Sequence, residues 1–495
     1  MAILDTFRAK AQRGDLASFA FFLLTGLLLT WLAITESLVF LVLVAAAALI
    51  GLGWWALVRA RNVDLELWQW ILLAALSGYM LLNYGFENLA IHIGGLPFIV
   101  SYAMMYGCLA LAIHRHPSLW LKAAKDPGMI FLFILMLQVG LHLIVDLPKY
   151  GLWAIRDSTM VLDGLFVTLG LLWAMKRSNL LIFMKWLLAF LVVNLFYSYT
   201  LPWGEGIQGV SPKSGVFNEV ALVGNYRGNV IFLMIGALFC LLLAQYVVRW
   251  PRWILMLLTV GQIFGLAIEQ ARAMYVSLIL SLIILALAGR AKESLRLTFI
   301  LLLALLPVLF LTVSGIKIEG RVGEVNMDFL AEHMRSITGA RNTPGSTNEG
   351  RMDWYEQAWR KYQDHPWVGV GFGQPLLDVD ENQTGAAIRM PHNASLSILV
   401  RLGVVGLVFW VMFHLYILAT FLYAYRQRKR YDPQTQATVL WLFLVYVVFI
   451  VEISVEAGLE FPSGAVPFYF LMGLTIGLIR YQFSQRRIAG QGQTA

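Results

Sequence analysis

Charged residues are scarce in this sequence of 495 residues: Asp, Glu, Lys and Arg together make up 13% of it, whereas 59% of the residues are hydrophobic and the mean hydropathy is +0.71. No soluble domain of this length has such a composition. Apolar runs of about 17 to 23 residues recur from end to end, and a helix needs roughly 20 such residues to cross the hydrocarbon core of a bilayer. The predicted fold class is therefore an all-α polytopic membrane protein.

Cysteine is also rare. Cys108 and Cys240 both lie inside apolar runs, where a small soft side chain packs readily without a redox role. The formal charge of +8 comes from basic residues that are spread through short loops and do not gather on one face, which argues against a nucleic-acid partner. The sequence shows no internal repeat, low-complexity tract or second soluble domain. We therefore interpret the basic residues as signals of membrane topology.

The hydrophobic pattern predicts about fourteen transmembrane helices. The first follows a basic segment (Arg8, Lys10 and Arg13) and lacks a small-residue cleavage pattern, so we expect a retained helix and not a signal peptide. The expected spans are residues 17–34, 38–58, 68–84, 97–113, 129–146, 159–175, 179–198, 228–247, 253–268, 273–289, 297–313, 394–424, 438–456 and 466–479.

The distribution of basic residues predicts that both termini are cytoplasmic. With that orientation the inner loops and both tails hold most of the 37 Lys and Arg residues, as the positive-inside rule requires. The short outer loops then hold only Lys149, Arg156, Lys213, Arg227 and Arg272. Four regions follow: N-terminal transmembrane helices (1–198), central helices with an outer loop (199–313), a long periplasmic loop (314–391), and C-terminal helices with a cytoplasmic tail (392–495).

The loop 314–391 is the one sizeable segment expected outside the membrane. It has a Gly-rich stretch, an expected amphipathic helix over residues 351–362, and a turn-rich run from His365 to Gly373. Its polar first half would suit a disordered connection, but a loop of this length in a compact protein is usually functional. Its aromatic residues could stack on sugar rings or anchor the loop at the interface; they are Trp354, Tyr355, Trp359, Tyr362 and Trp367.

Ionisable side chains in or beside a membrane span cost several kcal/mol unless they face a cavity or a partner, so each is a candidate functional group. For Asp163 and Lys185, which have no motif around them, we expect local pairing or snorkelling. Glu452 and Glu456 lie four residues apart near an outer helix end. They could line a cavity, although a solvated helix end is the simpler interpretation.

Three further groups lie at expected outer ends of spans and could converge on an anionic lipid headgroup. Glu269 to Arg272 closes a short outer turn, Arg351 begins the loop helix, and His392 stands directly before the span 394–424. Each also has a simpler explanation. Arg272 could anchor a helix at the interface, Arg351 could form a surface pair with Glu349 or Asp353, and His392 could be a polar helix-start residue.

Four motifs follow one another in the second half of the sequence: Gln270 to Ala273, Gly350-Arg351 with Trp354 and Ala358, His365-Pro366 with Gly369 to Gly373, and His392-Asn393 with Leu396 and Gly403. Their order resembles the O-antigen ligase and polymerase superfamily, over about residues 200–425. The resemblance implies a metal-independent, inverting glycosyltransferase that lies among the lipids of the bacterial inner membrane and needs no cofactor. Its donor would be an undecaprenyl-diphosphate-linked glycan, and its acceptor a second glycan, lipid A core or a protein hydroxyl.

The resemblance also assigns roles that suit the chemistry of the side chains. Arg272 and Arg351 would bind the diphosphate, because a guanidinium presents a planar fork of donors and stays charged. His392 would be the catalytic base that deprotonates the acceptor hydroxyl, because its ordinary pKa leaves a neutral imidazole at neutral pH. Arg227, Glu269 and Arg389 are additional candidates, and no metal ligand is expected. Ala271 and Ala273 depart from the Ser and Gly usual in the family, which loosens the match.

Three classes of function remain open at this point. The number of expected spans favours a polysaccharide polymerase over an O-antigen ligase or a protein O-glycosylating transferase, by analogy only. A secondary transporter is the alternative of another class, but transporters usually place charges near the midplane of repeated halves, and here they cluster at one face. A membrane scaffold would leave Arg272, Arg351 and His392 unexplained.

Overall fold

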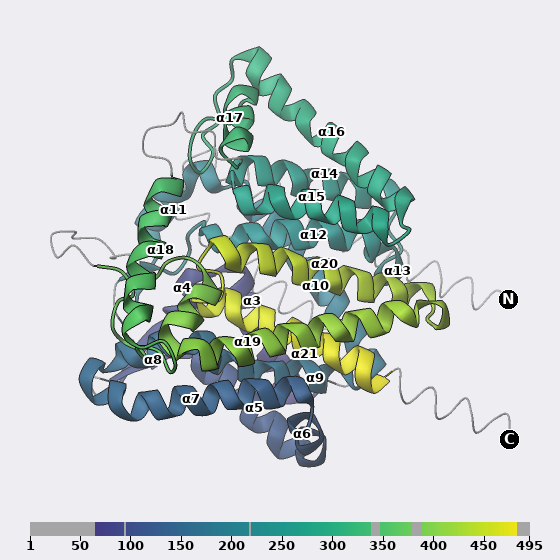
Figure 1. Cartoon of the computed structure of the whole chain (residues 1–495). Coiled ribbons are helices and arrows are strands. Elements are labelled where there is room, and N and C mark those ends of the chain that lie inside the picture. Colours follow the sequence, from purple (N-terminus) through teal and green to yellow (C-terminus); the bar gives the residue numbers. More distant parts are fainter. Residues whose placement is uncertain (1–64, 94–95, 217–218, 338–346, 379–388, 483–495) are drawn as a thin grey trace, which may run out of the picture.

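The computed structural model describes residues 65–93, 96–216, 219–337, 347–378 and 389–482. Long helices lie side by side and form one bundle (Figure 1). The first half of the bundle contains α3 (Leu67–Leu81), α4 (Tyr84–Glu87), α5 (Val100–Arg115), α6 (Pro117–Ala124), α7 (Pro127–Tyr150), α8 (Leu152–Leu162), η2 (Asp163–Phe166), α9 (Val167–Ala174), α10 (Arg177–Ser198), η3 (Leu201–Trp203), α11 (Gly204–Val210) and η4 (Arg227–Asn229).

The second half is built in the same way. It contains α12 (Val230–Leu242), α13 (Ala244–Val247), α14 (Arg252–Glu269), α15 (Arg272–Leu287), α16 (Ala291–Ser314), α17 (Met327–Ile337), α18 (Thr347–Asp364), α19 (Ala394–Arg426), η5 (Arg428–Arg430), α20 (Pro433–Val455), α21 (Pro462–Ile476) and the π-helical turn η6 (Gly477–Gln482).

The helices confirm the all-α prediction. Every span expected from residue 68 onward coincides with a helix, whereas the expected spans 17–34 and 38–58 lie outside the described residues. Within the described part, eight helical segments are long and apolar enough to cross a membrane, and Leu67–Leu81, Arg227–Leu242 and Arg272–Leu287 are shorter apolar helices. The total of fourteen spans and their orientation remain predictions.

The outer helices expose apolar side chains where a soluble protein would expose polar ones. Leu137 and Ile144 on α7, and Phe310 and Val313 on α16, are largely exposed, and these two helices lie at opposite edges of the bundle (Figure 1). Apolar surface of this extent is stable when it faces lipid. The bundle therefore has the exterior of a membrane protein.

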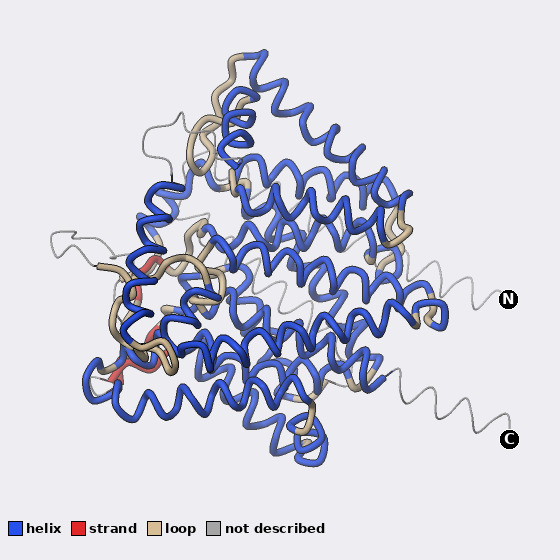
Figure 2. Tube along the Cα trace, in the orientation of Figure 1, coloured by secondary structure: helices blue, strands red, loops and turns tan. Residues whose placement is uncertain are grey.

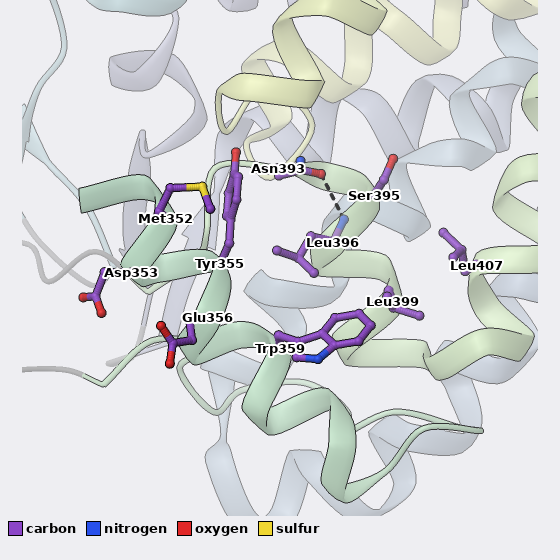
Figure 3. A pocket seen from close by; sticks show the side chains of 10 residues that line it. All are labelled: Met352, Asp353, Tyr355, Glu356, Trp359, Asn393, Ser395, Leu396, Leu399 and Leu407. Carbon is purple, nitrogen blue, oxygen red and sulfur yellow. Dashed lines mark hydrogen bonds between the residues drawn. The ribbon is translucent and has the colours of Figure 1, made fainter. Parts of the chain in front are cut away.

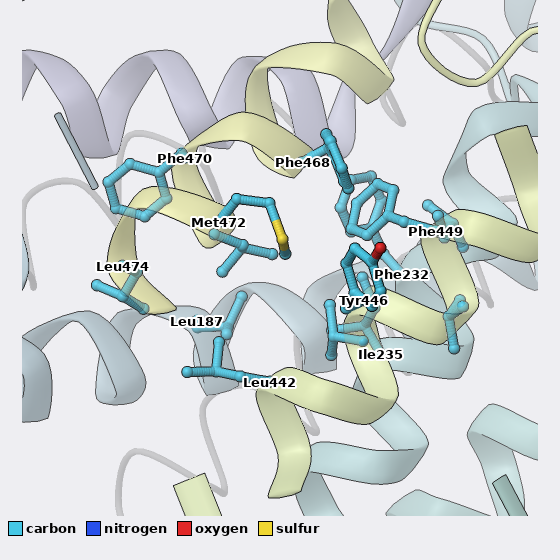
Figure 4. Packing of buried hydrophobic residues seen from close by; sticks show 14 of the residues in the cluster. Leu187, Phe232, Ile235, Leu442, Tyr446, Phe449, Phe468, Phe470, Met472 and Leu474 are labelled. Atoms are coloured by element: carbon cyan, nitrogen blue, oxygen red, sulfur yellow. The ribbon is translucent and has the colours of Figure 1, made fainter. Parts of the chain in front are cut away.

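The centre of the bundle is packed by α10, α12, α20 and α21. Leu187, Phe232, Phe449 and Phe468 are among the buried side chains that meet there (Figure 4). Helix α21 also packs tightly on α9, because glycines at the contact let the two backbones approach. A Cβ atom on Gly170 would lie 1.9 Å from the carbonyl oxygen of Phe470. The interior is therefore formed by helices that have little freedom to shift.

Most of the non-helical chain gathers at one end of the bundle, together with α11 and α18 (Figures 1 and 2). Helix α18 confirms the helix expected at residues 351–362 and extends it in both directions. Two short antiparallel hairpins, which the sequence did not predict, also lie here (Figure 2). They pair β1 (Ala90–Ile93) with β2 (Leu96–Ile99), and β3 (Lys213–Ser214) with β4 (Val220–Ala221); Ala90 lies opposite Ile99, and Lys213 opposite Ala221.

Helix α19 corrects the expectation of one continuous span over residues 394–424. Its helical geometry breaks at Gly403, which has φ 66°, and the carbonyl groups exposed by the break are paired with the turn-rich run that precedes it. The amide groups of Val370 and Gly371 donate to the carbonyl oxygens of Val400 and Arg401 at 2.9 and 3.0 Å. We call residues 366–371 the clamp segment, because it holds the first part of α19 at a fixed angle.

Candidate functional site

A buried carboxylate lies at the centre of the site. Helix α20 ends at Val455, and Glu456 follows it in an extended conformation with a side chain that is only 9% exposed. Its Oε1 accepts hydrogen bonds from Nη2 of Arg227 and, at 2.6 Å, from Nη2 of Arg351. Because Arg227 comes from η4 and Arg351 from α18, this carboxylate joins three separate parts of the chain.

His392 lies beside the same carboxylate, and several contacts fix its ring. Nδ1 of His392 is 3.9 Å from Oε2 of Glu456, and the imidazole stacks on Trp354 with a centroid distance of 5.3 Å. The backbone of His392 has φ 54°, an uncommon conformation for a non-glycine residue that persists only when its surroundings hold it. The next residue, Asn393, caps α19 and donates to the carbonyl oxygen of Ser454 at 3.0 Å.

Arg272 reaches the site from the start of α15. The preceding turn depends on Gln270, which adopts a left-handed conformation with φ 52° and accepts hydrogen bonds from the amides of Val322 and Gly323. Arg272 lies within electrostatic range of Arg227, Arg351 and Glu456. The structure therefore brings Arg272, Arg351 and His392 together, as the sequence suggested, along with the additional candidate Arg227.

The charges of this cluster favour a neutral histidine. Burial lowers the pKa of His392 below its ordinary value, and the positive charges of Arg351 and Arg227 lower it further, while Glu456 opposes them. An imidazole with a lowered pKa is unprotonated at neutral pH and can accept a proton. The three arginines also outnumber Glu456, so the site carries excess positive charge that suits an anionic ligand.

Glu269 and Arg389 have other partners. Glu269 is buried and paired with Arg321, whose Nε lies 2.8 Å from Oε2 of Glu269. This pair lies at the turn between α14 and α15, within electrostatic range of Arg227. Arg389 instead donates to the carbonyl oxygen of Gly373 at 2.7 Å.

Arg389 belongs to a second cluster that supports the clamp segment. Its guanidinium covers the ring of Trp153 at 4.0 Å and lies 3.5 Å from Oδ2 of Asp157. The fully buried Arg401 reaches the same oxygen at 2.9 Å and the carbonyl oxygen of Gly371 at 3.1 Å. We therefore assign Arg389 a structural position beside the site.

Several simpler interpretations of the sequence are wrong. Glu452 and Glu456 do not form a solvated helix end, because both are buried, and Arg351 pairs with Glu456. Asp163 is fully buried, and its carboxylate accepts no hydrogen bond from a described residue. One signal in the sequence pointed to Glu456, namely its four-residue spacing from Glu452, but this spacing does not show that the side chain is buried.

A groove with a cavity of about 820 Å³ lies between α18 and α19 (Figure 3). Trp359 extends from α18 toward Leu399 of α19, and Tyr355 extends from α18 toward Asn393 (Figure 3). Asn393, the neighbour of His392, also lines the groove. Of the loop aromatics, Trp354 thus packs on His392 while Tyr355 and Trp359 line the groove.

The fold and the site define a class: a helical membrane protein with arginines and a histidine gathered at one end of the bundle. Comparison with known proteins finds matches to part of the chain. Residues 254–411 match the family model described as O-antigen ligase. An O-antigen ligase of Pseudomonas aeruginosa PAO1 is 30% identical over 139 residues, which are 28% of this chain and 32% of that relative.

These matches confirm the resemblance to the O-antigen ligase and polymerase superfamily within the aligned part of the chain. The chain spans about a third of the length of the curated relative that it matches. The region matched by the family model contains Arg272, Arg351 and His392, whereas Arg227 and Glu456 lie outside it. Arg227 was an additional candidate from the sequence, whereas the contacts of Glu456 with the arginines are an observation from this structure.

Proposed function

We propose that this protein is a membrane glycosyltransferase that transfers a glycan from a polyprenyl-diphosphate donor, undecaprenyl diphosphate being the expected lipid, to an acceptor hydroxyl. The observation that carries the proposal is the convergence of Arg227, Arg272 and Arg351 on Glu456, beside His392, whose pKa is lowered. The match to the O-antigen ligase family model supports the same chemistry.

In the proposed reaction, Arg272 and Arg351 bind the diphosphate and stabilise the negative charge that develops on it as it leaves. His392 accepts the proton of the acceptor hydroxyl while that oxygen attacks the anomeric carbon. The bond between this carbon and the diphosphate oxygen breaks, so the configuration inverts and the lipid diphosphate departs with the electron pair. The imidazolium then releases its proton to solvent. No step in this sequence requires a metal ion.

We place the reaction on the periplasmic face of a bacterial inner membrane. Loop elements α11, α17 and α18 lie at the end of the bundle that holds the site (Figure 1), and the distribution of Lys and Arg assigns that end to the outside. A transporter is less well supported, because the charged cluster lies at one end of the bundle and not at its middle.

Two acceptors have specific support. The family model and the relative in Pseudomonas aeruginosa are both described as O-antigen ligase, which favours lipid A core as the acceptor. The expected number of spans favours a polymerase, in which the acceptor is another lipid-linked glycan. A protein hydroxyl would be the acceptor of an O-glycosylating transferase.

Gel analysis of surface glycans separates these functions. A deletion strain is complemented with the wild-type protein or with His392→Ala, and both proteins are quantified in the membrane. Loss of long chains with single repeats still attached identifies a polymerase. Loss of all attached repeats, with polymer left on the lipid carrier, identifies a ligase, and an unchanged glycan profile contradicts the proposed function.

A further inference from the structure

The contacts of Glu456 are unusual for a residue that only holds two segments together. Arg227 and Arg351 each use one nitrogen, Nη2, to reach the same oxygen, Oε1. Among the described residues, Nε and Nη1 of both guanidinium groups have no hydrogen-bond acceptor. Two arginines that share one carboxylate oxygen therefore keep most of their donors for another anion.

The charges around Glu456 point the same way. Arg272 is close enough to Arg227 and Arg351 for the three positive charges to repel one another, and Glu456 is in direct contact with Arg227 and Arg351. A diphosphate carries more negative charge than one carboxylate and offers more acceptor oxygens. It would therefore compete effectively with Glu456 for the arginines.

The second oxygen of Glu456 faces the proposed base. At 3.9 Å, Oε2 is an ion-pair distance from Nδ1 of His392 but too far for a hydrogen bond. A shift of about 1 Å would let Nδ1–H donate to the carboxylate. That bond fixes the imidazole tautomer in which Nε2 carries the lone pair, the state that a general base needs. The stack on Trp354 already holds the plane of the ring.

We propose that Glu456 is a positioning residue that exchanges partners during the reaction. In the free protein it occupies the place of the diphosphate between Arg227 and Arg351. When the donor binds, its phosphates take over the arginines, and Glu456 moves to Nδ1 of His392 and orients Nε2 toward the acceptor hydroxyl. Donor binding and orientation of the base are thereby coupled. This inference rests on the proposed function.

The test compares Glu456→Gln with wild type as full-length protein in detergent. Gln is nearly isosteric but cannot act as a competing anion, so pyrophosphate should bind at least about five-fold more tightly, a typical size for coupling between sites. With the glycan donor, KM should fall, while kcat should drop about 100-fold because His392 loses its orienting carboxylate. Glu456→Asp should recover part of kcat.

Glu452→Gln is the matched control. Glu452 is also buried and lies one helical turn earlier on α20, within electrostatic range of Arg227 and Arg351, but it makes no ion pair with them among the described contacts. We expect it to change pyrophosphate affinity less than two-fold, an expectation that follows from the absence of direct contact. If both variants changed pyrophosphate affinity equally, the change would come from the loss of any nearby negative charge and not from direct contact with the arginines. That result would overturn the exchange of partners.

The outcomes also separate this inference from the proposed function. Tighter pyrophosphate binding by Glu456→Gln, in a protein that transfers no glycan, would support the competition at the arginines and refute the glycosyltransferase. If Glu456→Gln leaves pyrophosphate affinity unchanged in a protein that does transfer glycan, the exchange of partners is refuted and the proposed function is not. A parallel loss of kcat, binding and thermal stability would show that Glu456 only ties the segments together, and would overturn the proposal.

Discussion

His392 is the residue on which the proposed chemistry depends most directly. We expect His392→Ala to reduce transfer by about 10² to 10⁴-fold, the usual contribution of general base catalysis. Folding should be retained, because the histidine is half-buried and Asn393 supplies the cap of α19. Single-turnover rates and thermal unfolding of the purified protein test both statements. Turnover of His392→Ala at the wild-type rate would refute the role of His392 as the general base.

The pH dependence of transfer follows from the lowered pKa of His392. Because the neutral imidazole is the active form, activity should be retained as the pH falls from 7 and should decline only below the ordinary histidine value of 6.5. An acid limb above that value in the profile of kcat/KM would contradict this prediction. The same shift affects stability. A histidine that is harder to protonate in the folded state costs stability as the pH falls below its unfolded pKa.

Arg351 tests the binding of the diphosphate. Arg351→Lys keeps the charge but removes the planar fork of donors, so we expect kcat/KM to fall by about ten-fold or more. Arg360→Lys is the control, since Arg360 is exposed on the same helix and lies away from Glu456. Donor titrations with both variants measure the difference. Equal activities would show that Arg351 acts only as a charge.

The sequence predicted this site in part. Arg272, Arg351 and His392 lie in recognisable motifs, and the structure brings them together. Glu456 could not be ranked, because a carboxylate at a helix end becomes a partner for arginines only when distant segments bury it. Arg389 was selected for its closeness to His392 in sequence, yet its guanidinium extends to Asp157 and Trp153.

At the scale of elements, the break in α19 can be tested at Gly403. Its φ of 66° strains any other residue, and a Cβ atom there would lie 2.3 Å from the carbonyl oxygen of Trp367. We expect Gly403→Ala to destabilise the protein by about 2 to 4 kcal/mol, from backbone strain and overpacking together. Gly107→Ala on α5 is the control, because a Cβ there meets nothing within 4 Å.

Thermal unfolding in detergent, followed for both glycine variants, distinguishes the break from a general effect of alanine. Gly107→Ala should be neutral or slightly stabilising, since alanine favours a helix over glycine by up to about 1 kcal/mol. The break of α19 at Gly403 could not be predicted from the sequence. Hydropathy along residues 394–424 is continuous, and the conformation of Gly403 depends on the clamp segment, which precedes it in the chain by more than thirty residues.

At the scale of the whole molecule, membrane topology can be measured by cysteine labelling. Both native cysteines are buried, so the background should be low. We expect Met352→Cys, which is 67% exposed on α18, to react with a membrane-impermeant maleimide in intact spheroplasts. Lys429→Cys, exposed in η5, should react only after permeabilisation. The reverse pattern would place the site on the cytoplasmic face.

Composition and periodicity were sufficient for the helical class and for the approximate position of each described span, because a bilayer requires long apolar helices. They could not predict the two hairpins or the close contact of α9 and α21, which depend on how distant segments meet. A hydropathy profile does not show the tight packing of Gly170 against the backbone of Phe470.

The break in α19 bears on how the site responds to the lipid. Transmembrane helices tilt to match the thickness of the bilayer around them. The amides of Val404 and Val405, just after the break, donate to the carbonyl oxygens of Pro366 and Trp367 in the clamp segment. The part of α19 that follows His392 is held by the same segment, by Gln138, which donates to the carbonyl oxygen of Leu402 at 2.6 Å, and by the pair of Arg401 with Asp157. We therefore expect the spacing between His392 and the arginines to change little when the acyl-chain length changes.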